Sequence, residues 1–149
     1  MKKISSALAA LAMLSTSIMA SSVAYAGTYT GVVTLIKGLT LTCTVTVDLY
    51  DPLHPGKAVI DISPPVSPEC DDLFITSNPH KYDIVGGVLT IYDIRVETLS
   101  IGNCFGDLSG TVTDNVDGSK TLTVNSMIPA EFGPLDCYVI GELWKPAHP

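Results

Sequence analysis

The chain carries little positive charge and has no long apolar run beyond its amino-terminal 20 residues. Eight Lys and Arg residues stand against fifteen Asp and Glu residues, which gives a net charge of −7. An acidic surface of this kind repels nucleic acid and anionic membranes. No later apolar run is long enough to cross a bilayer. We therefore exclude nucleic-acid binding and expect no transmembrane segment after the amino-terminal region.

Metal-binding spacings are also lacking. The cysteines form no C-x-x-C pair and no Cys/His cluster, so a zinc site is not expected. Residues 114–118 (DNVDG) share some features with a calcium loop. The acids that an EF-hand needs before and after its glycine are replaced by Thr113 and Val124, which favours a solvated turn. Residues 69–72 are acidic around Cys70, and we interpret them as surface charge rather than as a cation site.

Catalytic motifs are lacking as well. Residues 106–110 read GDLSG, which is not the G-x-S-x-G spacing of a nucleophile elbow. The three histidines, His54, His80 and His148, lie in proline-broken loops or in the tail, and no local Ser-His-Asp arrangement accompanies them. We therefore expect no catalytic residue, no cofactor and no enzymatic activity.

The amino-terminal residues 1–26 are organised like a secretory signal peptide. Two lysines precede a stretch rich in Ala, Leu, Met and Ile, and residues 24–26 form an A-x-A cleavage site. A membrane anchor or a buried helix is the alternative, but the apolar stretch is short and interrupted by serines. We expect cleavage after Ala26. The product is a secreted single domain, residues 27–149, with six basic residues, fifteen acidic ones and a net charge of −9.

All four cysteines lie in this predicted domain. They are Cys43, Cys70, Cys104 and Cys137. An even number of cysteines in an exported chain predicts disulfides. We favour pairing within each half of the chain, Cys43 with Cys70 and Cys104 with Cys137, each bond contributing roughly 3.5–4 kcal/mol on chain-entropy grounds. The competing arrangement joins Cys43 to Cys137 and Cys70 to Cys104, and the sequence does not decide between the two.

The clearest structural pattern is the alternation in residues 39–49. Apolar residues occupy every odd position, and Thr or Asp occupies every even one. A strand places successive side chains on opposite faces, whereas a helix would distribute these residues around its axis. Threonine also favours extended backbone because its β-carbon is branched. The pattern predicts a long strand with a buried face that includes Cys43 and Val45 and a polar face that includes Thr44.

Short β-type segments separated by Gly- and Pro-rich breaks continue along the chain. The expected strands cover residues 28–36, 39–49, 58–62, 73–76, 82–85, 88–101, 108–113, 120–125 and 137–143. A change of phase within residues 88–101 predicts a β-bulge. Residues 114–119 are expected to connect a hairpin, residues 102–106 to form a loop, and the tail from residue 145 to remain unpaired. The predicted fold is an all-β, single-domain antiparallel sandwich or barrel, stapled by disulfides.

Four segments carry a family resemblance. They are residues 31–43 (GVVTLIKGLTLTC), 67–70 (SPEC), 102–110 (GNCFGDLSG) and 137–143 (CYVIGEL), with the Gly118 hairpin before the last. The chain resembles the alkane oxidation protein activators of the PraB type, which are small exported four-cysteine bacterial proteins. The resemblance implies a non-catalytic protein, periplasmic or extracellular in a Gram-negative bacterium, that supports growth on long-chain alkanes. A role in the surface or biofilm matrix is also implied, and no catalytic residue is carried over.

Two functions follow from these observations. The first is a secreted accessory factor that contacts hydrocarbon or cell-surface components through apolar patches. The second is a structural surface or biofilm-matrix protein that self-associates or mediates adhesion. The polar face of residues 39–49 favours the second, because flat polar strands with weak register readily pair with neighbours.

Overall fold

The computed structural model describes residues 25–50, 56–63, 70–71, 73–76, 78–98 and 102–147. These ranges contain ten strands and no α-helix. The strands are β1 (Gly27–Lys37), β2 (Leu39–Leu49), β3 (Lys57–Ser63), β4 (Leu73–Thr76), β5 (His80–Val85), β6 (Val88–Thr98), β7 (Asn103–Asp114), β8 (Lys120–Ile128), β9 (Ala130–Phe132) and β10 (Cys137–Lys145). The expected signal peptide, up to residue 24, lies outside the described residues, as do Glu69 and Asp72 of the acidic segment.

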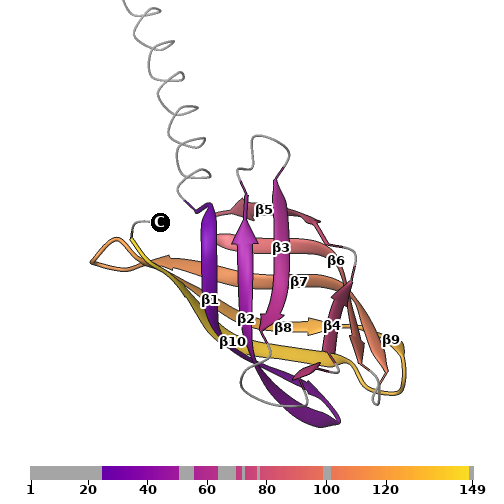
Figure 1. Cartoon of the computed structure of the whole chain (residues 1–149). Coiled ribbons are helices and arrows are strands. Elements are labelled where there is room, and N and C mark those ends of the chain that lie inside the picture. Colours follow the sequence, from indigo (N-terminus) through magenta and orange to yellow (C-terminus); the bar gives the residue numbers. More distant parts are fainter. Residues whose placement is uncertain are drawn as a thin grey trace, which may run out of the picture.

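Eight of the strands close into an antiparallel barrel. The order around it is β1, β2, β3, β5, β6, β7, β8 and β10, and β10 pairs back onto β1. The short strands β4 and β9 are not among these eight; β4 pairs with β6 beyond the end of β5, and β9 pairs with β7. Figure 1 shows β1, β2 and β3 crossing in front of β6 and β7, and inward side chains of these strands form part of the core. The all-β prediction is confirmed, and the barrel is the form that the sheet takes.

The alternation in β2 sets the inner and outer faces of the barrel. Leu41, Cys43, Val45, Val47 and Leu49 are all buried and belong to the core, whereas the intervening threonines face outward. Strand β2 pairs with β1 from Lys37↔Leu39 to Gly27↔Leu49, so the same alternation continues across the neighbouring strand. The assignment of the two faces from the sequence is therefore confirmed.

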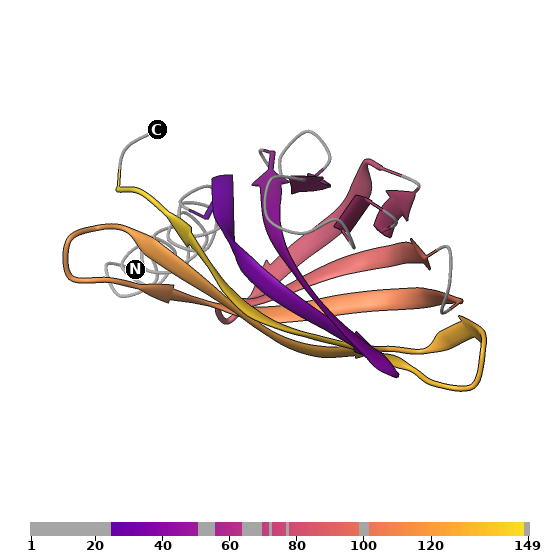
Figure 2. The same ribbon diagram turned by 60° about the horizontal axis from the view of Figure 1, so that its bottom comes forward.

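Two inner-face glycines allow β1 and β10 to bend as they close the barrel. In the register, Gly31 lies opposite Leu143 and Gly141 opposite Val33. A Cβ atom on either glycine would collide with the backbone of the facing strand. Figure 2 shows that both strands curve strongly along their length. A glycine removes the side chain where two backbones approach closely, which is a common device at barrel bends.

Strand β6 contains the predicted bulge. The register with β7 shifts between Ile91 and Ile94, and Asp93 at this point has a positive φ of 56°. The Asp93 backbone N–H donates to Asp107 Oδ1 at 3.1 Å, which satisfies a donor that the ladder leaves free. Before the bulge β6 pairs with β5, and after it β6 pairs with β4. The phase change in the sequence thus marks where one partner strand replaces another.

Three local expectations were wrong. Residues 102–106 are not a loop, because β7 begins at Asn103 and pairs there with Glu97. The inward Cys104 holds this segment in the sheet through its disulfide, which outweighs its two glycines. The tail begins one residue later than expected, since Lys145 still pairs with Lys120 and the first proline that cannot donate to the ladder is at position 146. Strand β9 was not expected, because three residues carry no periodic pattern.

Candidate functional site

Both disulfides lie on the inner face of the barrel. Cys43 is bonded to Cys70 with their Cα atoms 5.9 Å apart, and Cys104 is bonded to Cys137 with their Cα atoms 6.2 Å apart. The structure therefore has the pairing that the sequence favoured. Each of the four side chains is at most 3% exposed, which is typical of structural rather than redox-active bonds. None of the four thiols is free, so none is left to bind a metal.

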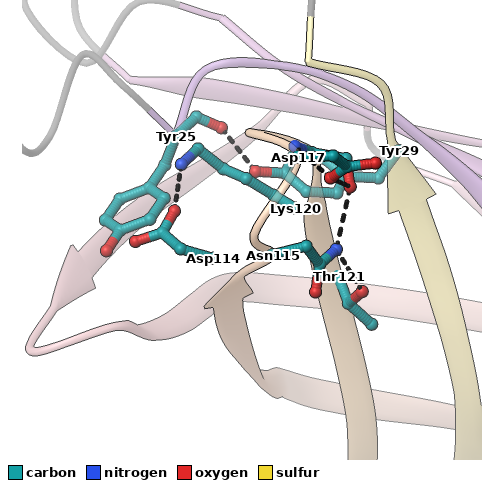
Figure 3. A network of polar contacts seen from close by, with 8 residues as sticks. Tyr25, Tyr29, Asp114, Asn115, Asp117, Lys120 and Thr121 are labelled. Atoms are coloured by element: carbon teal, nitrogen blue, oxygen red, sulfur yellow. Dashed lines mark hydrogen bonds and ion pairs between the residues drawn. The ribbon is translucent and has the colours of Figure 1, made fainter.

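The acidic tip of the β7–β8 hairpin uses its carboxylates internally (Figure 3). Ser119 donates to Asp117 Oδ1 from its backbone N at 3.0 Å and from its Oγ at 2.6 Å. Asn115 Nδ2 donates to Ser119 Oγ at 3.0 Å, and Asp114 forms an ion pair with Lys120. The bonds from Ser119 lower the pKa of Asp117 because they favour its charged form. Across the described ranges no group of three or more His, Cys, Asp or Glu side chains could hold a metal ion.

His80 is the histidine that falls within the described residues, and it is the first residue of β5 rather than part of a loop as expected. It is 4% exposed at the start of β5, and its Nε2 has no hydrogen-bond partner in the part of the chain that the structure covers. Burial lowers the pKa of His80, although the backbone carbonyls of Tyr92 and Asp93 oppose this effect. The ring is therefore neutral at neutral pH. In the GDLSG segment, the backbone N–H of Ser109 donates to Ser126 Oγ at 3.1 Å.

The inner face of the barrel surrounds a cavity of about 70 Å³, which we call the barrel cavity. Its wall consists of Val, Leu and Ile side chains, with Cys43, Ser109 and Gly110 as the exceptions. A buried water needs two to four polar partners, so an aliphatic cavity of this kind stays dry. The cavity is suited to an apolar occupant.

Tyrosines fill one end of the barrel. Tyr29, near the start of β1, is fully buried, and its hydroxyl donates at 2.8 Å to the carbonyl of Tyr25, a residue that the predicted cleavage after Ala26 would remove. Tyr82 is 4% exposed and donates to the Tyr50 carbonyl. The pKa of Tyr29 is raised strongly, first by burial and then by nearby groups that include Tyr25 and Asp114. The Tyr29 ring therefore remains neutral, and the two buried tyrosine rings close this end of the interior.

A lysine fills the other end. Lys37 is the last residue of β1, and although it is inward-facing and 3% exposed, its Nζ donates to the Leu135 carbonyl. Its stem lies close to Gly102, where an added Cβ would be 3.3 Å from Lys37 Cε. A buried ammonium needs such acceptors because it cannot be solvated. Lys37 thus ties the loop after β9 across the end of the barrel.

Apolar side chains also gather on the outside of β1, β10 and β8. We call this patch the apolar outer face, and its residues, which are 36–53% exposed, are Val32, Ile36, Met127, Tyr138, Ile140 and Trp144. The register places Ile36 opposite Tyr138 and Tyr138 opposite Met127. The positions between them are mostly threonines, with one acid, Glu142. Exposed apolar side chains gathered on one face make it a candidate interaction site.

The sequence analysis missed the apolar outer face, although a signal was present. Val32-Val33 and Leu35-Ile36 place apolar residues on both faces of β1, and Val139-Ile140 does the same on β10. A strand with only one buried face should alternate. Consecutive apolar residues in an otherwise alternating chain therefore indicate a second apolar surface.

Comparison with known proteins identifies the family of the chain. A family model described as "Alkane oxidation protein activator PraA/PraB-like" matches residues 1–147. No curated protein and no solved structure matches the chain. Within the described ranges no helix is long and apolar enough to cross a membrane. Because the family model covers almost the entire sequence, the chain belongs to the PraA/PraB-like family of alkane oxidation protein activators.

Proposed function

We propose that this chain is an exported, non-catalytic accessory protein that supports bacterial alkane utilisation at the cell surface. It contacts hydrocarbon through the apolar outer face. The family description gives the biological setting, and the two disulfides are compatible with an oxidising compartment outside the cytoplasm. Residues 1–26 supply the export signal in this proposal.

The observation that carries the proposal is the contrast between the apolar outer face and the other outward strand positions. On β5, β6 and β7 the outward side chains include Asp83, Asp93 and Asp107, all exposed. On β1, β10 and β8 they include Val32, Ile140 and Trp144. Exposed apolar area on an otherwise acidic protein gains free energy by leaving water for an apolar phase. The lack of basic residues among these positions disfavours an anionic surface as the partner.

A triple variant of the apolar outer face tests the proposal. Val32→Thr, Ile140→Thr and Trp144→Thr together remove apolar area while keeping β-branched residues in the strands. We expect the variant to need at least tenfold more protein to lower the interfacial tension of hexadecane, which corresponds to about 1.4 kcal/mol. Its stimulation of hexadecane oxidation by a strain that lacks the protein should fall in parallel.

The matched control replaces three exposed valines elsewhere. Val85 and Val88 lie in the β5–β6 hairpin and Val116 lies at the β7–β8 tip, with exposures of 72%, 46% and 109%. Changing all three to Thr should leave both measurements unchanged. If the outer-face variant also behaves like the unmodified protein, hydrocarbon contact through this face is refuted.

Export is tested separately by the mass of the secreted protein. A product that begins at Gly27 supports the signal peptide, and one that retains Lys2 and Lys3 contradicts secretion by this route. No observation on the described residues favours the self-associating matrix protein. Strand β2, whose polar face suggested it, pairs with β1 along its length and with β3 from Thr44 to Leu49.

A further inference from the structure

The barrel cavity has a ligand chemistry that differs from that of the outer face. No charged side chain lines it, and Ser109, although part of the wall, is exposed on the outer side of β7. A polar or charged group placed inside would lose its hydration without gaining partners. An occupant of this space must therefore be hydrocarbon at the point where it is enclosed.

The size of the cavity narrows the class of occupant. Its volume of about 70 Å³ is roughly half of the ~150 Å³ of an apolar cavity known to hold benzene. A six-membered ring is therefore too large. About three carbon atoms of a chain fit by the same comparison. The cavity suits the end of an unbranched alkyl chain, with the rest of the molecule outside it.

Side chains fill both ends of the barrel, so a route into the cavity would have to pass through its wall. Tyr29 and Tyr82 fill one end, and Lys37 fills the other. The wall between β3 and β4 differs from the rest because, among the described residues, no backbone ladder joins these two strands, although they lie in contact. Within the same residues β4 pairs with β6, and the β3–β5 ladder consists of Lys57↔Lys81 and Ala58↔His80.

Two isoleucines mark this part of the wall. Ile62 on β3 and Ile75 on β4 both line the cavity, and both are half-buried, so each reaches from the interior to the surface. Further along β3, the backbone N and O of Ile60 bond to the carboxamide of Asn78 in place of a neighbouring strand. In the part of the chain that the structure describes, separating β3 from β4 at Ile62 and Ile75 thus breaks no strand ladder between them.

We propose that the barrel cavity binds the end of an unbranched alkyl chain, which enters between β3 and β4 past Ile62 and Ile75. The physiological meaning of this site rests on the proposed function, because an alkane activator encounters such chains. The binding itself rests on the inner-face residues and is independent of the apolar outer face.

Methyl NMR of the disulfide-intact protein provides the direct test. With 13C-labelled Ile, Leu and Val methyl groups, n-octane should shift signals of Ile91, Ile94 and Val124, which are buried and line the cavity. Cyclohexane at equal activity should not shift them. If n-octane leaves these signals unchanged, or if cyclohexane shifts them equally, the proposal is overturned.

A cavity-filling variant tests whether n-octane binds inside the barrel cavity. Val124 is 3% exposed and faces the cavity, whereas the preceding Thr123 on β8 is exposed on the outside. Val124→Phe should weaken n-octane binding at least tenfold, and Thr123→Phe should leave it unchanged. Equal affinities in the two variants would overturn the proposal.

A second variant keeps the test decisive if Val124→Phe does not fold. Ile75→Asp places a carboxylate at the half-buried entrance, where water still reaches it in the free protein. A bound chain would cover that charge, so n-octane affinity should again fall at least tenfold. Unchanged affinity in a folded Ile75→Asp protein would refute the entrance between β3 and β4.

The binding measurement and the alkane-oxidation measurement separate the two proposals. Unmodified protein that stimulates hexadecane oxidation but gives no octane shifts overturns the cavity site alone. Protein that binds octane in the cavity but does not stimulate oxidation overturns the proposed function and leaves the site in place.

Discussion

On one side of the barrel, β2, β1, β10 and β8 pair along nearly their whole lengths, from Gly27↔Leu49 and Thr30↔Trp144 to Cys137↔Ile128. On the other side, β3, β4, β5 and β6 pair in short stretches broken by a bulge. We call these the continuous wall and the interrupted wall. The continuous wall is stabilised by uninterrupted backbone ladders and carries the apolar outer face. The interrupted wall depends on individual side chains and borders the proposed entrance to the cavity.

The interrupted wall replaces ladder hydrogen bonds with two devices. The carboxamide of Asn78 accepts from Ile60 N at 3.2 Å and donates to Ile60 O at 3.0 Å, as a neighbouring strand would. The Cys43–Cys70 bond attaches the segment before β4 to the inner face of β2. Each device is local, so its removal should weaken the interrupted wall first. The predictions below use that difference, from the largest expected effect to the smallest.

The largest effect is expected from a charge inside the continuous wall. Val45 is 8% exposed and lines the cavity, so Val45→Lys buries an unpaired ammonium and should unfold the domain, at a cost of several kcal/mol. Thr44→Lys on the outer side of the same strand is the control, with an expected change within about 0.5 kcal/mol. Urea unfolding followed by circular dichroism measures both. A harmless Val45→Lys would invert the assignment of the two faces.

The next largest effect is expected from the disulfides. Their sequence separations, 27 and 33, give nearly equal chain-entropy contributions of roughly 3.5–4 kcal/mol each. Replacing Cys43 and Cys70 by Ala, or Cys104 and Cys137 by Ala, should therefore cost about the same in global unfolding. Hydrogen exchange should separate them, because only the first pair anchors the segment that leads into β4. Loss of protection in β4 from both variants alike would contradict a special role for the Cys43–Cys70 bond in the interrupted wall.

The difference between the walls also explains what could be read from the sequence. The alternation of residues 39–49 and the phase change in residues 88–101 are local patterns, so the β2 faces and the β6 bulge could be predicted. The pairing of Ile60 with a side chain, Asn78, has no periodic signal. Nor does the burial of Lys37, since a lysine is normally an exposed residue and only the closure of the barrel places it against the Leu135 carbonyl. The cavity also has no local signal in the sequence, because its volume depends on how side chains from distant strands pack together.

Removing the Asn78 carboxamide, which takes the place of a neighbouring strand in the interrupted wall, should have a moderate effect on stability. Asn78→Ala leaves the backbone N and O of Ile60 without their present partners, and because Asn78 is exposed, water can replace part of the interaction. We expect a loss of about 1–2 kcal/mol in the free energy of unfolding. Asn125→Ala on the outer side of β8, in the continuous wall, should change it by less than about 0.5 kcal/mol. Equal losses from the two variants would show that Asn78 is no substitute for a strand.

The smallest effect on stability is expected from His80, and it appears only as the pH falls below neutral. Burial lowers the pKa of His80 in the interrupted wall below its ordinary value of 6.5, so the unfolded chain binds a proton more readily than the folded one. Its contribution to stability is therefore complete above about pH 6.5 and is lost as the pH falls below that value. In urea titrations at pH 7.5 and pH 5, His80→Gln should lose less stability on acidification than the unmodified protein. His54 and His148 are present in both proteins and cancel in the comparison.

Hydrogen exchange at pH 5 should show the loss first in β3 and β5, which meet at Ala58↔His80, while β1 and β10 keep their protection. If acidification loosens β1 and β10 first, or if His80→Gln is as acid-sensitive as the unmodified chain, the buried histidine is not what makes the interrupted wall sensitive to pH.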